Sequence, residues 1–229
     1  MQGRLLHLVL LVLLVLTFNH LLTSPDFQVS VARVYGNRLV SAEAVVEAAS
    51  LPRGSILLVD GTRIRESILT LQQIKDARVS RQFPNQVQIH VTERSPACIW
   101  KVKDTLYLAS EDGVLLGTSE STGQVILVVD LDGRPRTIGD RVDKEAVVTA
   151  SRLAILLPRQ VGLTPKYYEY SATEGIAVHT DFAGRVIFGD SEDLEAKVAT
   201  FKAISDRIRL DGLKVHIVDL RFEGRPYLR

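Results

Sequence analysis

The chain begins with an apolar run, "LLHLVLLVLLVLTFNHLL", in which fourteen of the eighteen residues are Leu, Val or Phe. As a helix this run spans about 27 Å, close to the ~30 Å hydrocarbon core of a bilayer. The stretch "FNHLLTSPDF" contains no small-x-small site of the kind at which a signal peptide is cleaved. We therefore predict a tail over residues 1–4, a retained transmembrane helix over 5–22 and a linker over 23–26.

A second pattern covers residues 27–94 and predicts a strand, two helices and two further strands. The segment "FQVSVARVYGN" alternates apolar and polar residues as a half-buried strand does, and Ser41 can cap the helix that follows. Ile64, Ile68, Leu71 and Ile74 recur at the spacing of a second helix. The segment "VSRQFPNQVQIHV" alternates on both sides of a proline and predicts a hairpin. We expect a three-stranded sheet with one apolar face that the two helices cover.

Residues 95–229 predict a larger module. Short apolar or alternating segments, from "ACIWKV" to "KVHIVDLRF", predict strands. Two longer segments carry apolar residues at helical spacing: Ala146, Ala150, Leu153 and Leu157, ended by Pro158, and Leu194, Val198, Phe201, Ile204 and Ile208, ended by Gly212. The predicted fold is α+β: one transmembrane helix, a small βααββ module and a mostly antiparallel β-domain with two helices.

The two modules meet at Glu93-Arg94-Ser95-Pro96. We interpret Glu93 and Arg94 as a clamp that fixes the angle between the modules, with Pro96 stiffening the joint. The alternative is an exposed pair that recognises a partner.

Charge and composition limit the classes of function. Among 229 residues the net charge is +1 and there is one cysteine, Cys98. The balance predicts no nucleic-acid partner, and a lone cysteine cannot form an intrachain disulfide. Arg4 precedes the apolar run and Asp26 is the first charge after it. The positive-inside rule then places the N-terminus in the cytoplasm and the bulk of the chain outside it.

The sequence contains none of the common catalytic motifs. A phosphate-binding loop, the His-Glu-x-x-His zinc motif and the Gly-x-Ser-x-Gly elbow are all absent. His90, His179 and His216 occupy alternating strand positions, where solvated side chains are expected. The segment "DLDG", Asp130 to Gly133, lacks the later ligands of a calcium loop and is interpreted as a turn. We expect no catalytic residue, metal, cofactor or small-molecule substrate.

Several segments together resemble the FtsQ/DivIB family of bacterial cell-division proteins, over nearly the whole chain. The segments "VARVYGNRLVSAEAVVEAASLPRGSILLVD" and "IKDARVSRQFPNQVQIHVTERSPACIW" are similar to the opening and closing of an FtsQ-type POTRA domain. The segments "GRVIFGDSEDLEAKVATFKAI" and "VDLRFEGRP" are similar to the end of the family's β-domain. The resemblance implies that residues 27–94 form a POTRA domain and that residues 95–229 form an FtsQ-type β-domain.

The resemblance implies a non-catalytic scaffold of the divisome in the inner membrane at the septum. Its expected partners are FtsB-like (DivIC-like) and FtsL-like bitopic proteins, and its role is to localise and regulate septal peptidoglycan synthesis. The family's partner adds a strand at the C-terminal edge of the β-domain. That carries over to six residues here: Arg221, Phe222, Gly224, Arg225, Tyr227 and Leu228.

The POTRA hairpin offers a second candidate surface. A chain of strand, helix, helix, strand and strand usually places its first strand beside its last, which leaves the strand Arg78 to Phe83 at an edge. An open edge can accept another strand. We therefore predict that other divisome proteins dock near Arg78, Ser80 and Gln82.

The alternative interpretation is a protein of another class. In it, the chain is a membrane-anchored extracytoplasmic enzyme or ligand-binding protein with a POTRA-like module. A deep pocket with convergent ionisable groups favours this alternative, whereas a bare C-terminal sheet edge favours the scaffold.

Overall fold

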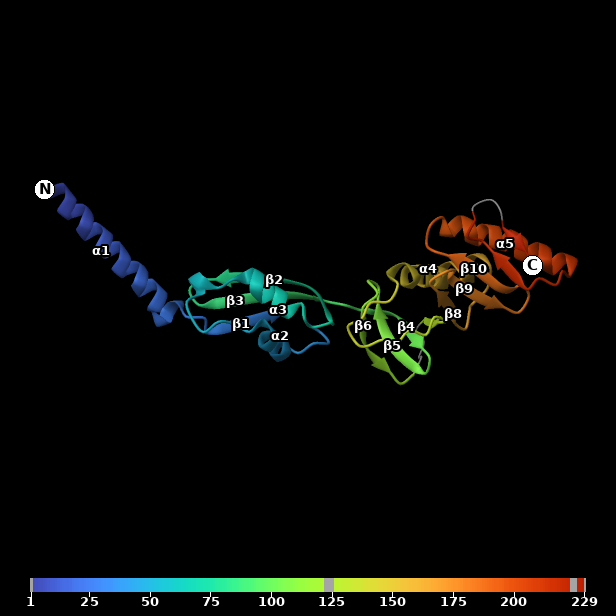
Figure 1. Cartoon of the computed structure of the whole chain (residues 1–229), viewed down its shortest axis with the longest axis horizontal. Helices are drawn as coiled ribbons and strands as arrows, with labels where there is room; N and C mark the ends of the chain where they lie inside the picture. The colour runs from blue at the N-terminus through green and yellow to red at the C-terminus, as the bar shows by residue number, and fades with distance from the viewer. Residues whose placement is uncertain (1, 122–125, 223–225, 229) are drawn as a thin grey trace. The chain divides into compact units, whose positions relative to one another are not determined.

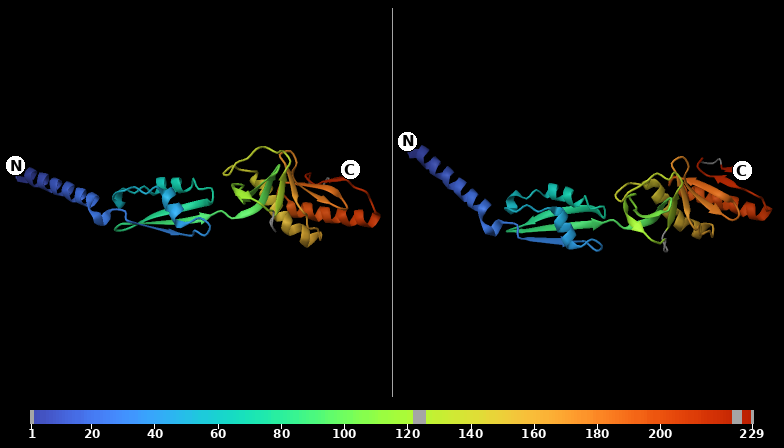
Figure 2. Two further views of the ribbon diagram at one scale, coloured as in Figure 1. Left: turned by 90° about the horizontal axis from the view of Figure 1, so that it is seen from below. Right: turned by 60° about the horizontal axis from the view of Figure 1, so that its bottom comes forward.

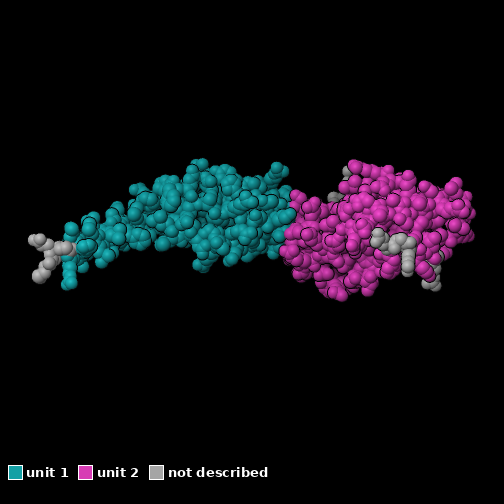
Figure 3. All heavy atoms as spheres, turned by 90° about the horizontal axis from the view of Figure 1, so that it is seen from above, with its two compact units in different colours: residues 1–94 teal, residues 95–229 magenta. Residues whose placement is uncertain are grey.

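The structure, a computed structural model, describes residues 2–121, 126–222 and 226–228. The chain divides into two compact units, Met1–Arg94 and Ser95–Arg229, shown in different colours in Figure 3. Each unit has a buried apolar core of its own.

The first unit starts with helix α1 (Gln2–Thr23), followed by a 3-10 turn (Pro25–Phe27). The window Leu6–Thr23 has a mean hydropathy of 2.1, so α1 is long and apolar enough to cross a membrane. Its threonines satisfy their hydroxyl groups within the helix. Thr23 donates to the carbonyl oxygen of Asn19 over 2.8 Å, and Thr17 donates to that of Leu13. Polar side chains bonded in this way are tolerated in a spanning helix.

Three strands and two α-helices follow α1 in the first unit. Their bounds are β1 (Val31–Tyr35), α2 (Ala42–Ala49), α3 (Gly61–Ile68), β2 (Ile74–Gln82) and β3 (Gln86–Glu93), with a 3-10 turn at Ile56–Leu58. The sheet order is β1-β3-β2, with β1 parallel and β2 antiparallel to β3 (Figure 1). The βααββ module predicted from the sequence is therefore present.

Caps and apolar periodicity explain these elements. The Ser41 hydroxyl accepts from Ala44 N over 3.1 Å at the start of α2, and Asp60 caps α3 by accepting from Thr62 N over 2.9 Å. Ile64 and Ile68 are buried as predicted. Helix α3 is shorter than the apolar pattern indicated, because the chain turns after Ile68 and the next apolar residues lead into β2. The buried core of this unit consists of Val45, Ala49, Ile56, Val59, Ile64, Ile68, Ile74, Ala77, Val87, Ile89 and Val91.

The second unit is one mixed sheet with two helices. Its elements are β4 (Pro96–Val102), β5 (Thr105–Ser110), β6 (Leu115–Ser119), β7 (Leu127–Asp130), α4 (Lys144–Gln160), β8 (Tyr168–Ser171), β9 (Gly175–Thr180), β10 (Gly184–Gly189), α5 (Leu194–Asp211), β11 (Ile217–Asp219) and β12 (Tyr227–Leu228). Among the described residues the sheet order is β12-β11-β10-β9-β8-β7-β4-β5-β6. Five of these neighbouring pairs are antiparallel and three are parallel.

The two helices are the crossovers of parallel strand pairs. Helix α4 joins β7 to β8 and α5 joins β10 to β11, and each of these strand pairs is parallel. A parallel pair needs a long connection of this kind. The helices lie together on one face of the sheet (Figure 2). The predicted apolar stripes face the core, with Ile204 only partly buried.

Aromatic contacts fix α5 on the sheet. Phe201 meets Phe188 of β10 edge-on at 5.8 Å between ring centroids and stacks with Phe182 at 6.1 Å. Helix α4 continues two residues beyond Pro158, where the sequence predicted its end. A proline so close to the C-terminus of a helix removes only one of its hydrogen bonds.

The "DLDG" segment is a turn, as predicted. One oxygen of the buried Asp130 carboxylate accepts from Asp132 N over 3.0 Å, and the other accepts from Trp100 Nε1 over 3.1 Å. Both oxygens therefore have structural partners. Cys98 is buried in the same core, and burial raises the pKa of its thiol to about 12, so the thiol stays protonated at neutral pH.

Glu93 and Arg94, which the sequence predicted as a clamp between the modules, both make hydrogen bonds within the first unit. The Glu93 carboxylate accepts backbone N–H groups of residues 38–40 over 2.9–3.1 Å. Arg94 Nη1 donates to the carbonyl oxygens of Gln72, over 2.8 Å, and Ile74. These bonds lie within the first unit, where the two side chains fix the loop after β1 and the turn before β2.

Candidate partner-binding edges

The C-terminal edge of the large sheet is built by the last crossover. Strand β11 follows α5 in the chain and pairs in parallel with β10, with Val218 opposite Val186. Strand β12 then pairs antiparallel to β11, with Leu228 opposite Val218 and Tyr227 opposite Asp219. No described strand pairs with the outer side of β12.

Gly184 allows β10 and β11 to approach each other. Its φ is +60°, and a Cβ at this position would lie 2.2 Å from the carbonyl oxygen of His216. Only glycine fits this left-handed, crowded position without a backbone shift. The neighbouring N–H of Arg185 donates to the same His216 oxygen over 2.9 Å.

An ion pair joins Asp219, the last residue of β11, to Arg221. Arg221 Nη2 lies 2.7 Å from Asp219 Oδ2, and Arg221 Nε lies 3.0 Å from Oδ1, which makes a two-point contact. Arg221 Nη1 donates to the carbonyl oxygen of Thr173 over 3.1 Å, so the side chain also reaches the β8–β9 turn. The hydrogen bond from Arg221 lowers the pKa of Asp219, which keeps this carboxylate charged at neutral pH.

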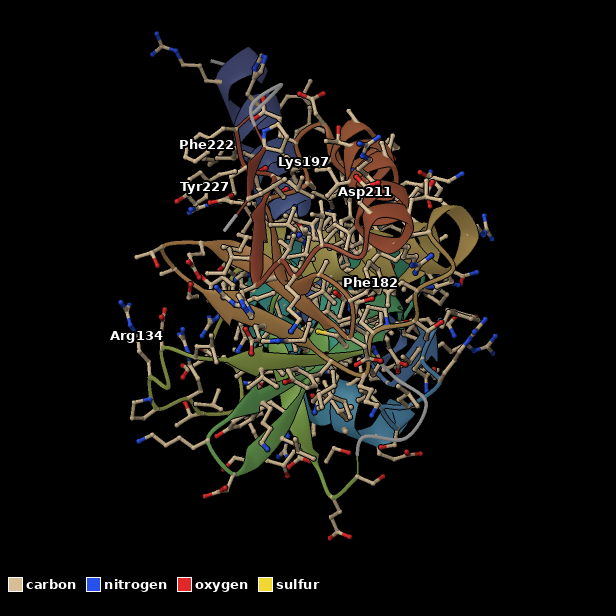
Figure 4. All side chains as sticks on the ribbon, turned by 90° about the vertical axis from the view of Figure 1, so that its right-hand side faces the viewer. Arg134, Phe182, Lys197, Asp211, Phe222 and Tyr227 are labelled. Atoms are coloured by element: carbon tan, nitrogen blue, oxygen red, sulfur yellow. The ribbon has the colours of Figure 1, made fainter. Side chains whose placement is uncertain are left out.

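Three large apolar side chains are exposed beside this ion pair. Phe222, Tyr227 and Leu228 are 61%, 59% and 48% exposed. Phe222 and Tyr227 project outward from the edge (Figure 4). The Arg221 guanidinium carbon lies 5.6 Å from the Phe222 ring centroid, a cation–π contact on one side of the ring. A group of exposed apolar side chains at a free strand edge is typical of a binding surface.

A hollow of about 210 Å³ adjoins this edge, between the start of α5 and the C-terminal segment. Its lining comes from the loop before α5, the first turns of α5 and the residues around Phe222: Asp190, Glu192, Asp193, Ala196, Lys197, Thr200, Leu220, Arg221, Phe222 and Pro226. The hollow therefore lies between the C-terminal segment and the start of α5.

Two charged residues of the lining, Lys197 and Asp190, form an ion pair with each other, and a third, Arg221, pairs with Asp219 outside the lining. Lys197 Nζ lies 2.9 Å from Asp190 Oδ1, and this hydrogen bond lowers the pKa of Asp190. The hydrogen bond to Asp219 raises the pKa of Arg221. A carboxyl group that exchanges protons near neutral pH needs a raised pKa. Asp190 therefore suits a structural role rather than acid–base chemistry.

The structure describes four of the six predicted edge residues. Arg221, Phe222, Tyr227 and Leu228 are brought together, whereas Gly224 and Arg225 lie outside the described residues. Sequence reasoning missed Asp219 as the partner of Arg221. The signal was present, because residues two apart in a strand point to the same side of the sheet and "DLR" places opposite charges at that spacing.

The other candidate edge is strand β2 of the first unit, which the sheet order leaves unpaired on one side. Arg78, Ser80 and Gln82 are all exposed and lie opposite His90, Gln88 and Gln86 of β3. Gln88 Nε2 donates to Gln82 Oε1 across the two strands.

Along β2, the backbone N–H and C=O groups of successive residues point alternately toward β3 and away from it. Arg65 Nε of α3 donates to the carbonyl oxygen of Ala77 over 3.0 Å, and the carbonyl oxygen of Val79 lies 3.5 Å from where a Cβ of Gly61 would be. Residues 77 and 79 thus direct their backbone groups away from β3. In an antiparallel pair every second residue does so, and the residues between, including Ser80, direct theirs toward β3.

Known proteins resemble the chain over most of its length. Residues 27–94 match the family of POTRA domains of the FtsQ type. A cell division protein FtsQ from Streptomyces bingchenggensis is 30% identical over 199 residues, covering 82% of this chain and 74% of the relative. A cell division protein FtsQ from Chloroflexus aurantiacus is 29% identical, covering 96% and 80%. A cell division protein DivIB from Clostridium tetani is 22% identical, covering 96% and 84%.

Proposed function

Because this chain belongs to the FtsQ/DivIB family of cell-division proteins, we propose that it is a non-catalytic membrane scaffold of the divisome that binds an FtsB-like (DivIC-like) partner by strand addition on β12. An FtsL-like protein joins the same complex. The scaffold helps to localise and regulate septal peptidoglycan synthesis.

The observation that carries this proposal is the exposed edge formed by β12. An edge strand offers a row of backbone N–H and C=O groups to an incoming strand. The hydrogen bonds that an added strand makes to this edge, each worth roughly 0.5–1.5 kcal/mol net, act together with the burial of Phe222 and Tyr227. Ordering a flexible partner offsets part of this gain. The sum supports micromolar or somewhat tighter binding, at roughly −8 kcal/mol.

The ion pair between Lys197 and Asp190, which lowers the pKa of Asp190, supports a scaffold over the alternative of an enzyme or ligand-binding protein. The family names describe division proteins rather than enzymes. No group of three or more His, Cys, Asp and Glu side chains suited to a metal ion occurs among the described residues.

The apolar helix α1 and the family both fit a membrane-anchored septal protein. In the proposed orientation the N-terminus lies in the cytoplasm and both folded units lie outside it. A reporter enzyme that works only outside the cytoplasm, fused after Arg229, should then be active. Activity of a reporter that works only in the cytoplasm would reverse the orientation.

Co-purification of the full-length chain with an FtsB-like protein tests the binding edge. Tyr227→Ala and Phe222→Ala should each weaken binding about tenfold, because each ring buries an aromatic surface against the partner. Deletion of residues 224–229 should abolish co-purification. Leu210 of α5 is 82% exposed and lies outside the edge and the hollow, so Leu210→Ala is the matched control and should bind normally.

Circular dichroism of each variant shows whether the second unit remains folded. A folded deletion variant that keeps its partner at wild-type affinity would mean that the partner binds elsewhere.

A further inference from the structure

One end of the first unit gathers the segments nearest to α1. The N–H of Val29 donates to the carbonyl oxygen of Gly54 over 2.9 Å, and the N–H of Ser30 donates to that of Asn85 over 3.1 Å. The loop before the 3-10 turn Ile56–Leu58 and the β2–β3 hairpin tip therefore lie where the chain enters this unit from α1.

Apolar side chains are exposed at this end. Leu58 is 69% exposed and Phe83, at the hairpin tip, is 57% exposed, with Pro84 next to it. Arg81 connects the two segments, because its Nη1 donates to the carbonyl oxygen of Leu57 over 3.1 Å. Arg53 is exposed in the neighbouring loop. An aromatic ring and a leucine beside arginines is a composition suited to the interface between lipid headgroups and acyl chains.

The tether to α1 is short. Helix α1 ends at Thr23 and Gln28 already bridges to Ser55, so five residue steps separate the helix from the folded unit. Fully extended they reach at most about 18 Å. The actual tether is more compact, because the N–H of Gln28 donates to the carbonyl oxygen of Pro25 over 3.2 Å.

The apolar span is also short for a membrane. The apolar run, residues 5–22, extends about 27 Å as a helix, against a hydrocarbon core of about 30 Å. A span shorter than the core draws its flanking residues toward the interface. The short tether then brings the hairpin end within reach of the headgroups.

We propose that this end of the first unit, formed by Leu58, Phe83 and Pro84 with Arg53 and Arg81, rests on the lipid surface of the bilayer that α1 spans. The inference rests on the proposed membrane anchoring by α1. Asp26 and Asp60 lie in the adjoining segments, but the Asp60 carboxylate is occupied by the N–H groups at the start of α3. Contact therefore combines apolar insertion with attraction of the arginines to anionic headgroups.

Tryptophan quenching by brominated lipids in nanodiscs tests this contact on the full-length chain. The single tryptophan, Trp100, is fully buried in the second unit and supplies a constant background. Phe83→Trp should be quenched strongly by lipids brominated near the headgroup. Leu39 is 75% exposed at the opposite end of the sheet, in the loop held by Glu93, so Leu39→Trp is the matched control and should remain unquenched.

Lipid charge provides the second measurement. The discs should contain phosphatidylglycerol, and Arg53→Gln or Arg81→Gln is added to the Phe83→Trp chain. Either substitution should lower the ratio of chains whose first unit contacts the lipid to chains whose first unit does not by about fivefold. Equal, weak quenching of Phe83→Trp and Leu39→Trp would overturn the lipid contact. Failure of the wild-type chain to co-purify with the discs would overturn the anchoring itself, and this inference with it.

Discussion

The carboxylate of Glu93 accepts hydrogen bonds from backbone N–H groups of a loop 53 to 55 residues away in the sequence. Partial burial raises the pKa of Glu93, but the three N–H donors outweigh that effect and hold it below the usual value. The folded state thus favours the charged form. Its contribution to stability is present above about pH 4.5, the unfolded value, and is lost as the pH falls through the lower folded pKa.

Glu93→Gln should therefore destabilise the first unit by about 1 kcal/mol near neutral pH, because an amide offers one acceptor oxygen and no charge. Urea unfolding of wild type and variant between pH 3 and 7 measures the difference in the free energy of unfolding. The difference should shrink toward the acid end of the range. A difference that is constant across the range would show that the charge of Glu93 does not stabilise the loop.

In the second unit, the residue whose substitution should be most informative is Gly184. Gly184→Ala forces a side chain into a left-handed conformation against the carbonyl oxygen of His216, and should cost at least about 2 kcal/mol. Hydrogen exchange should accelerate in β10 and β11 and stay unchanged in the first unit. Gly117→Ala, where an added Cβ meets nothing within 4 Å, is the control.

At the scale of elements, the backbone direction of β2 decides how its edge can be tested. Residues 77 and 79 direct their backbone groups outward, and by the same alternation Arg81 does so too, whereas Ser80 faces β3. Proline at Ser80 would therefore remove a hydrogen bond of the sheet itself, while proline at Arg81 removes only an outward N–H.

We predict that Arg81→Pro weakens septal recruitment, if divisome proteins add a strand to β2, while the melting temperature changes little. Arg81→Ala removes the same side chain but keeps the N–H, so it should be recruited better than the proline variant. Fluorescence microscopy of tagged chains compares the two. Equal recruitment of both variants would exclude strand addition at this edge.

Local patterns were sufficient to predict most elements and the strand order of the first unit, but not the parallel pairings of the second unit. Strand alternation and the helical stripes identified the βααββ module and both helices of the second unit. The parallel pairing of β10 with β11 was not predicted, because it joins residues on either side of α5 and leaves no trace in local periodicity. Likewise, the partners of Glu93 lie on a distant loop, and nothing in "TERSP" indicates that its carboxylate folds back into its own unit.

At the scale of the molecule, two separate cores predict two unfolding transitions. Phe201→Ala should destabilise the second unit by about 3–5 kcal/mol and Ile68→Ala the first by about 2–5 kcal/mol, since both side chains are fully buried. Each substitution should move one calorimetric transition and leave the other in place. A shift of both transitions by either variant would show that the units stabilise each other.

The candidate site was predicted from the sequence only in part. Resemblance pointed to the aromatic residues and to Arg221, and alternation could have added Asp219. The hollow beside the edge was not predicted, because Lys197 and Asp190 approach the C-terminal segment only after α5 has packed on the sheet.

The connection through α5 has a consequence for assembly in the cell. Strand β11 enters the sheet only after an 18-residue helix has crossed over it, and pairings between distant residues form late in folding. A chain in which β11 has not yet joined β10 has no strand on which β12 can pair. If β12 is the docking strand proposed above, such a chain cannot bind the partner even when its first unit is folded.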